Sequence, residues 1–229
     1  MRIAELELIR DLPLFHDMTP VNFDTLTEAA LLQRFPARVD LIHEGALPDF
    51  LHVVVEGSVE LYAQHAGRET TLDILRPITT FILAAVIRDE PYLKSARTIT
   101  ETRILMIPAE ALRDTFSRDA AFARAIVNEL AARYRSVVRA LKNEKQRTSC
   151  ERLANWILKT DAQQGGSGHV AFEYDKRTLA SLLGMTPENL SRSFSQLKKY
   201  GVRSTNRGLA IEDRDVLRSY AQPTPLIDG

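Results

Sequence analysis

The chain has 229 residues, of which 45% are hydrophobic and 26% charged, and 30 basic residues balance 30 acidic ones. These values are typical of a globular protein with one large or two ordinary domains, and the zero net charge excludes a global basic field for nucleic acid. The single cysteine, Cys150, excludes an internal disulfide and indicates a reducing, cytoplasmic environment. No apolar run approaches the ~20 residues that cross a bilayer, and no apolar signal core opens the chain, so we expect no membrane association.

The first half of the chain predicts two short helices followed by a sheet domain. Apolar spacing favours a helix within residues 1–15, and Thr19-Pro20 opens a second helix through about Leu32. From residue 33 to 106, short period-two runs are separated by glycines about every ten to twelve residues, as in a sandwich or barrel. Gly57-Ser58 lies between two β-branched runs and predicts a hairpin turn.

A long helix is predicted after a short one at Glu110–Phe116. Asp119 can cap the long helix, which extends to about Lys145. Its narrow apolar seam, flanked by charges, consists of Ile126, Leu130, Tyr134, Val137 and Leu141. Such a seam indicates a two-stranded coiled coil and therefore a homodimer. The alternative is a helix packed on its own domain, and both interpretations can hold along different parts of it.

A polar segment over 144–149 predicts a hinge after the long helix. Cys150 follows this segment, either as a redox switch or, more commonly for a lone cysteine, as a small buried hydrophobe. Next we expect an amphipathic helix over 151–160, a flexible exposed loop at Gln163–Gly168 and a strand over 170–174.

Residues 176–200 have the pattern of a helix-turn-helix. We expect a first helix over 176–183 and a tight turn at Gly184-Met185-Thr186. Thr186 can then cap the second helix, and Pro187 suits its first position because the missing N–H has no partner there.

The second helix sorts its side chains onto two faces. One face is an apolar stripe of Leu190, Phe194 and Leu197. The opposite face carries Glu188, Ser191, Arg192 and Ser195. This face suits the major groove of DNA, because Arg pairs bidentately with guanine and Glu accepts from the amino group of cytosine. The alternative is a helical hairpin whose polar face is only solvated.

The rest of the chain predicts a winged domain. Asn206-Arg207-Gly208 separates two short strands of a β-wing, Asp213–Tyr220 favours a last helix, and the tail from Pro223 is expected to be extended and loosely held. Over 170–218, nine basic residues stand against six acidic ones, a modest basic bias compatible with DNA. No G-x-S-x-G, H-E-x-x-H or phosphate-cradling loop occurs, so an enzyme is the weakest interpretation.

The predicted elements form an α+β chain in three parts: a β-roll domain over 1–118, a dimerisation helix and hinge over 119–146, and a winged helix-turn-helix domain over 147–229. The runs LIHEG, VVEGSVELY, GRETTLDIL, KSA and TPENLSRSF occur in an order that resembles the CRP/FNR family of bacterial transcription regulators along nearly the whole chain. More narrowly, MRIAELELIRDLPLF and TFILAAVIRDEPYL are similar to FtrB-type regulators linked to iron transport.

The resemblance implies a DNA-binding regulator with defined contacts. The FNR-type branch carries E-x-x-S-R on its reading helix, which matches Glu188, Ser191 and Arg192 and implies an inverted repeat with TTGA-like half-sites. We expect phosphate contacts from Arg177, Thr178, Thr186, Ser195 and Lys198. In the family, the region of the glycine-rich loop can touch RNA polymerase.

Two departures from the family pattern concern its signals. Members that bind cyclic nucleotides carry a Gly-Glu pair after the phenylalanine that resembles Phe81, and an Arg before Ser-Ala. Here Ala84 or a neighbour replaces the Glu and Lys94 replaces the Arg, which loses the bidentate fork for phosphate, so we predict no cyclic-AMP binding. Iron–sulfur sensing needs four thiolates, which one cysteine cannot supply.

What remains is an apolar pocket whose candidate residues are Phe81, Leu83, Val86, Lys94 and Ser95. We favour a pocket filled by its own side chains, without a cofactor. The alternative is an apolar effector or haem, for which the available groups are His16, His43, His52, His65 and Met106. None of these falls in a haem or metal motif, so we expect no metal site.

Overall fold

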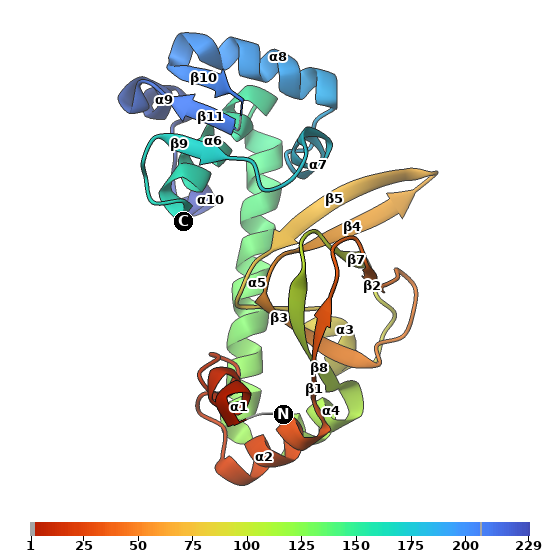
Figure 1. The fold of residues 1–229 in the computed structure, drawn as a ribbon. Helices are drawn as coiled ribbons and strands as arrows, with labels where there is room; N and C mark the ends of the chain where they lie inside the picture. The colour runs from red at the N-terminus through yellow and green to blue at the C-terminus, as the bar shows by residue number, and fades with distance from the viewer. Residues whose placement is uncertain (1–2, 207) are drawn as a thin grey trace. The chain divides into compact units, whose positions relative to one another are not determined.

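The computed structural model describes residues 3–206 and 208–229, so Arg207, which the sequence places at the tip of the wing, lies outside the described residues. The chain divides into two compact units, one ending at Arg133 and the other starting at Tyr134. Both units mix helices and strands, which confirms the predicted α+β class (Figure 1). Within the described ranges, no helix is long and apolar enough to cross a membrane.

The first unit is a roll of short strands with helices before and after it. Its strands are β1 (Leu31–Phe35), β2 (Asp40–Ile42), β3 (Phe50–Glu56), β4 (Val59–His65), β5 (Arg68–Leu75), β6 (Thr79–Phe81), β7 (Ser95–Thr98) and β8 (Thr102–Pro108). Its helices are α1 (Ile3–Arg10), α2 (Pro20–Ala29), α3 (Leu83–Arg88), α4 (Ala109–Arg118) and the first part of α5 (Ala120–Gln146).

The strands form two antiparallel sheets, with the orders β1-β8-β3-β6 and β2-β7-β4-β5. Both sheets contribute to one hydrophobic core, for example through Val54 of β3 and Leu61 of β4. Helix residues such as Phe23, Leu112 and Phe122 belong to the same core. Because β3 packs against apolar groups on both faces, its buried residues form a continuous run, Leu51–Val55, and do not alternate.

The predicted hairpin at Gly57-Ser58 is wrong, because β3 and β4 lie in different sheets. Gly57 has a φ of +85°, and a Cβ at this position would lie 2.3 Å from the carbonyl oxygen of Glu101, so only glycine fits the turn. The hairpin is instead β4–β5, where Ala66 and Gly67 both have positive φ, as a two-residue type I′ turn requires. Gly57 does form a turn, but the strand that follows it, β4, pairs with β5 and β7 and not with β3.

The second predicted helix ends earlier than Leu32. α2 stops at Ala29, and Leu31 and Leu32 open β1, which pairs with β8 along its whole length. The hydrogen-bonding edge of β8 therefore decides the conformation of two residues that helical spacing assigns to a helix.

Asp119 caps the start of α5, as predicted. It also accepts hydrogen bonds from residues at the start of α2. Oδ1 accepts the N–H groups of Ala121 and Phe122, both at 3.0 Å. Oδ2 accepts the N–H and hydroxyl of Thr19, both at 2.9 Å, and the amide of Asn22 at 3.0 Å. Burial opposes ionisation, but the hydrogen bonds from Asn22, Phe122 and Thr19 outweigh it and hold the pKa of Asp119 well below its usual value.

The second unit contains the last part of α5 and the C-terminal third of the chain. Its further helices are α6 (Ser149–Gln163), α7 (Lys176–Leu182), α8 (Pro187–Leu197), the 3₁₀ turn η1 (Lys198–Tyr200), α9 (Arg214–Ala221) and α10 (Pro225–Asp228). Its strands are β9 (His169–Ala171), β10 (Val202–Thr205) and β11 (Gly208–Ile211), paired in the order β10-β11-β9. Helices α6 and α8 and the three strands surround a core that includes Leu153, Ile157 and Leu209.

The segment predicted as a hinge, 144–149, is mostly helical. α5 continues to Gln146, and Thr148 begins α6 with a capping box in which its side chain and that of Glu151 bond each other's backbone N–H. Only Arg147 and Thr148 therefore lie outside the helices at this junction.

The loop at Gln163–Gly168 is mostly exposed, as predicted, but its backbone is hydrogen-bonded to a buried side chain. The fully buried carboxylate of Asp161 accepts a hydrogen bond from the N–H of Gly168 at 2.7 Å and forms an ion pair with Arg214. Arg214 also donates to the carbonyl of Gly166 at 2.9 Å, so one Asp–Arg pair holds both ends of the glycine turn.

The tail is not loosely held either, because residues 225–228 form α10. Asp228 accepts two hydrogen bonds from Arg147, at 2.6 and 2.7 Å. The sequence could not show this contact, since the two residues lie 81 positions apart.

We predict that Asp119→Asn lowers the free energy of unfolding by about 2 kcal/mol at pH 7, because an amide turns N–H donors toward the donors that the carboxylate accepts. Folding lowers the pKa of Asp119, so its contribution exists above the unfolded-state value of 3.8 and is lost as the pH falls below it. Urea unfolding should show a gap between wild type and variant that holds from pH 7 to 5 and shrinks below pH 4.

The matched control is Asp114→Asn, an exposed carboxylate on α4 whose pairing with Arg118 is weak at 3.5 Å. This change should alter the free energy of unfolding by less than about 0.5 kcal/mol. A gap for Asp119→Asn that stays constant down to pH 3 would contradict the role given to its charge.

Candidate nucleic-acid interface

The helix-turn-helix has the geometry that the sequence predicts. α7 is followed by Gly184, which has a φ of +61°, and the N–H of Met185 returns to the carbonyl of Ala180 at 2.9 Å. The hydroxyl of Thr186 accepts the N–H of Asn189 at 3.2 Å, and Pro187 occupies the first turn of α8. Local capping therefore defines where the second helix begins.

The apolar stripe of α8 is buried in the core of its unit. Leu190, Phe194 and Leu197 are all buried and belong to the same cluster as Leu153 and Ile157 of α6. Because this stripe packs inward, the opposite face of α8 must point to solvent.

That opposite face carries Glu188, Ser191, Arg192 and Ser195, all of them exposed. Hydrogen bonds from its own backbone N–H and the Thr186 hydroxyl lower the pKa of Glu188, so it is an ionised acceptor at neutral pH. The Ser195 hydroxyl donates to the Ser191 carbonyl at 3.1 Å. The structure thus brings the predicted base-reading residues together on one free surface.

Asn189 is a neighbour of this face that is not among the predicted site residues. Its Oδ1 accepts from the guanidinium of Arg192 at 2.7 Å, which restrains the arginine before any ligand is bound. The signal was available, because residues three apart on a helix are neighbours.

The residues predicted to contact phosphate lie at the ends of the two helices. Arg177 and Lys198 are exposed, at the start of α7 and just after α8. Thr178 is half-buried and its N–H bonds Asp175 at 2.8 Å, while the Thr186 hydroxyl accepts the N–H of Asn189 and donates to Glu188.

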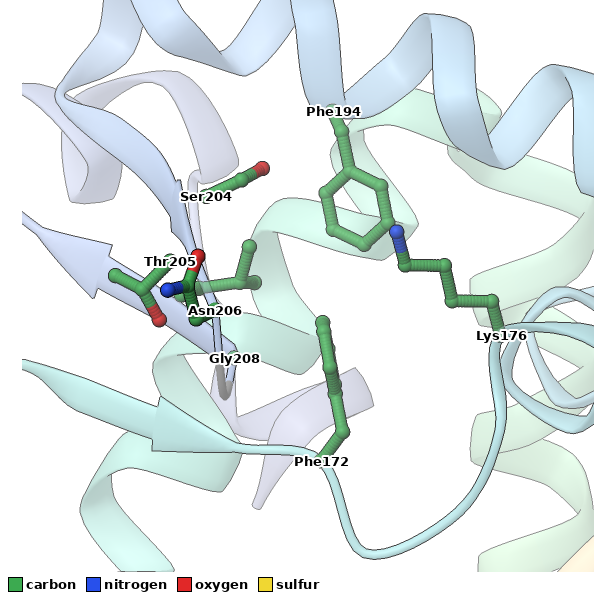
Figure 2. A pocket seen from close by; sticks show the side chains of 8 residues that line it. Phe172, Lys176, Phe194, Ser204, Thr205, Asn206 and Gly208 are labelled. Carbon is green, nitrogen blue, oxygen red and sulfur yellow. The ribbon is translucent and has the colours of Figure 1, made fainter.

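A hollow of about 120 Å³ opens between the wing, α8 and the loop before α7 (Figure 2). Its lining residues combine aromatic walls, a lysine and the polar end of β10: Phe172, Lys176, Phe194, Ser204, Thr205, Asn206, Gly208 and Leu209. Figure 2 shows Phe172, Phe194 and the wing residues around the hollow, with the Lys176 side chain extending toward Phe194 in this view. The sequence identifies Lys176 only as one of the basic residues of this region, and its spacing does not distinguish the wing hydroxyls.

Arg152 connects the helix-turn-helix to the end of α5. Its buried guanidinium donates to the carbonyls of Leu183 at 2.9 Å and Gly184 at 3.2 Å, which form the turn between α7 and α8. It also donates to the carbonyl of Arg147 at 2.9 Å and approaches that of Glu144 at 3.4 Å. One side chain thus satisfies carbonyls at the ends of two helices.

Cys150 is buried beside this junction. Burial raises the pKa of its thiol, and its sulfur lies 3.9 Å from the carbonyl of Ser193. A protonated, enclosed thiol supports the interpretation as a small hydrophobe over that as a redox switch.

The apolar seam of α5 divides between the two units. Ile126 is 0% exposed and belongs to the core of the first unit, so it has no surface to offer to a second chain. Tyr134, Val137 and Leu141, by contrast, are 72%, 65% and 54% exposed. Exposed apolar groups at helical spacing are what an unpaired coiled-coil face presents.

The candidate pocket residues of the first unit lie largely inside its core. Phe81, Leu83 and Val86 are buried, and the Ser95 hydroxyl accepts the N–H of Glu44 at 2.9 Å. Burial lowers the pKa of Lys94, which is half-buried and senses Asp73 and Arg133. These surroundings differ from an open site for an anion.

A polar lock lies next to these residues. The Thr80 hydroxyl donates to Glu129 at 2.9 Å, and Arg133 donates to the same carboxylate at 3.0 Å. Arg133 also reaches the carbonyl of Thr80 at 3.3 Å. β6 and α5 are therefore joined by a closed set of bonds within the first unit.

The histidines do not gather into a metal site. His16, His43 and His65 are exposed, whereas His52 is buried against Phe81, with 5.1 Å between ring centroids. Burial lowers the pKa of His52 to about 4, so it is neutral at pH 7. Across residues 3–206 and 208–229, no three His, Cys, Asp or Glu residues are placed to hold a metal ion.

A β-roll followed by a long helix and a winged helix-turn-helix defines a DNA-binding transcription regulator with an N-terminal domain of the cyclic nucleotide-binding fold. Residues 32–119 match the model of the cyclic nucleotide-binding domain, and residues 151–220 match that of the Crp-like helix-turn-helix domain. The chain belongs to the CRP/FNR family, as its sequence motifs predict.

Named relatives cover most of the chain. A CRP-like cAMP-activated global transcriptional regulator of Mycobacterium tuberculosis is 24% identical over 222 residues, which are 94% of this chain and 99% of that protein. The cyclic AMP receptor protein of Thermus thermophilus is 27% identical over 191 residues, 83% of this chain and 87% of that protein. The structure of FixK2 from Bradyrhizobium japonicum has the same fold, with a TM-score of 0.73, 22% identity, and coverage of 85% and 98% of the two chains.

Proposed function

We propose that this regulator is a homodimer that reads an inverted repeat with TTGA-like half-sites and does not require cyclic AMP. The observation that carries the proposal is the exposed face of α8, on which Glu188, Ser191 and Arg192 lie together opposite a buried stripe. A half-site of this type contains one G·C pair. Arg192 can pair with its guanine while Glu188 accepts from its cytosine, and Ser191 supports them.

The contacts around this face supply position and not sequence. Arg177, Lys198 and the hydroxyls of Thr178, Thr186 and Ser195 are the proposed phosphate contacts. Lys176 and the Ser204–Asn206 end of the wing extend this set, because their hollow combines an ammonium with hydroxyl and amide donors beside the reading helix.

Dimerisation is supported by the distal part of α5. Tyr134, Val137 and Leu141 expose apolar surface that a second copy of the helix would cover. Paired helices would present two copies of α8 to major grooves about one helical turn apart, which explains why an inverted repeat is the expected operator. By analogy with the family, the anchored loop at Gly165–Gly168 is where we place contact with RNA polymerase.

Independence of cyclic AMP is supported by the first unit. Ala84 offers no carboxylate for a ribose, and Lys94 is half-buried with a lowered pKa where the family has an arginine. Glu129 and Arg133 already bond each other and Thr80. A nucleotide would have to replace these bonds without the usual bidentate partner for its phosphate.

We predict that Arg192→Ala costs ~1–3 kcal/mol of operator affinity and removes the preference for the operator over a duplex changed at the G·C pair. Lys198→Ala should weaken binding to both duplexes by the same factor. It should also lower the slope of log affinity against log salt concentration by about one. Fluorescence anisotropy at several salt concentrations measures both effects. Unchanged affinity and preference in Arg192→Ala would refute the base-reading role.

Leu141→Glu should convert the dimer to a monomer at micromolar concentration, because two carboxylates would face each other in the seam. Analytical ultracentrifugation measures the state. The matched control is Ala132→Glu, which places the same charge on an exposed residue of α5 on the side of the helix away from Tyr134 and Leu141. A wild-type monomer, or a dimer that Leu141→Glu leaves intact, would contradict the assignment.

Addition of cyclic AMP should leave operator affinity within about twofold and give no saturable heat in calorimetry, since the phosphate-pairing arginine is absent. The Thermus relative, titrated in parallel, is the positive control. A tenfold or larger gain in operator affinity with the nucleotide would overturn this part of the proposal.

A further inference from the structure

The C-terminal residues after α9 lie beyond the part of the chain that the helix-turn-helix model matches. The match to the Crp-like helix-turn-helix model ends at residue 220, whereas the chain continues to Gly229. After Gln222, which has a positive φ of 45°, the chain turns back, and Thr224 begins α10 by accepting the N–H of Leu226 at 3.4 Å. Asp228 accepts the N–H of Thr224 at 2.7 Å and closes this short helix on itself.

Arg147 holds this segment with an almost fully enclosed guanidinium. Its side chain is 7% exposed and that of Asp228 is 24% exposed, and two parallel hydrogen bonds of 2.6 and 2.7 Å join them. The same guanidinium donates to Asn143 Oδ1 at 3.1 Å and approaches the Gln222 carbonyl at 3.5 Å. A paired fork of this kind fixes orientation as well as distance.

The contacts lead from the tail to the end of the paired helix. Asn143 lies in the last turn of α5, and Arg147 lies in the two-residue link between α5 and α6. Lys142, also on α5, directs its ammonium toward the Leu226 carbonyl at 3.4 Å. At the other end of the segment, the Asn155 amide of α6 donates to the Ala221 carbonyl at 2.7 Å.

We infer that residues 222–229 form a clasp that sets the angle between the end of α5 and the DNA-reading helices, and thereby the half-site spacing that the dimer accepts. This inference rests on the proposed function. Arg152 joins α5 to the turn of the helix-turn-helix, and the clasp joins it to α9 and α6 from a separate set of residues. With two struts in place, the link at Arg147-Thr148 cannot act as a free swivel, so the two reading helices of a dimer keep one separation.

If Asp228 acted only through its charge, its neutralisation would strengthen DNA binding and not weaken it. Asp228→Asn deletes a negative charge, which by itself strengthens attraction to phosphates. A weaker complex with the palindrome would therefore report the loss of position and not a change in the electrostatic field.

The test compares wild type, Asp228→Asn, Asp228→Glu and a chain ending at Gln222. The DNA probes are a palindromic duplex, the same duplex with half-sites moved apart or together by one base pair, and a duplex with a single half-site. Urea unfolding of each variant confirms that it is folded. The matched control is Asp215→Asn, an exposed carboxylate of α9 that makes the same charge change.

We expect Asp228→Asn and the shortened chain to lose about tenfold in affinity for the best palindrome and to change less than twofold on the single half-site. Their preference among the three spacings should flatten, Asp228→Glu should restore part of it, and Asp215→Asn should lose nothing. If the shortened chain does not fold, Asp228→Asn and Asp228→Glu still decide the result.

If the variants lose affinity equally on the palindrome and the single half-site, or lose none on either, the clasp is overturned. The proposed function would still stand in that case if the wild type prefers the palindrome. A wild-type protein that does not distinguish the palindrome from a scrambled duplex would overturn both.

Discussion

The DNA-reading half of this regulator depends on a buried arginine that bonds mainly to backbone. Arg152 donates to carbonyls at the end of α5 and in the turn after α7, where helices leave acceptors without partners. A lysine could not replace it, because one ammonium lacks the planar fork that reaches two segments at once. The position of α8 relative to the distal part of α5 follows from these bonds, and so does any function that needs α8 in a defined place.

In the same unit, the two faces of α8 differ in polarity and burial. The inward stripe of α8 is apolar and buried, and its outward face carries the carboxylate, hydroxyl and guanidinium groups. Asn189 restrains Arg192 within the helix itself, so the guanidinium would lose less conformational freedom on binding a ligand. Asp161 and Arg214 serve the exposed glycine loop in the same way, holding backbone that sequence composition makes flexible.

The β-roll of the first unit concerns the question of a ligand and not that of DNA. Phe81, Leu83 and Val86 are buried in its core, and Thr80, Glu129 and Arg133 bond one another beside them. Burial makes the charged form of Lys94 less favourable and so lowers its pKa. A family model matches this region, but a match of fold does not carry over the ligand, which depends on individual side chains.

The sequence by itself determined those features whose partners lie within a few residues. The cap at Thr186, the turn at Gly184, the two faces of α8 and the start of α5 at Asp119 all follow from contacts across three or four positions. Only the tertiary structure decided the crossing at Gly57, the burial of Ile126 and the ion pair between Arg147 and Asp228. In each of these cases a local pattern allowed two outcomes, and the choice came from a strand edge, a core or an ion that is distant in the chain, which no short-range spacing can specify.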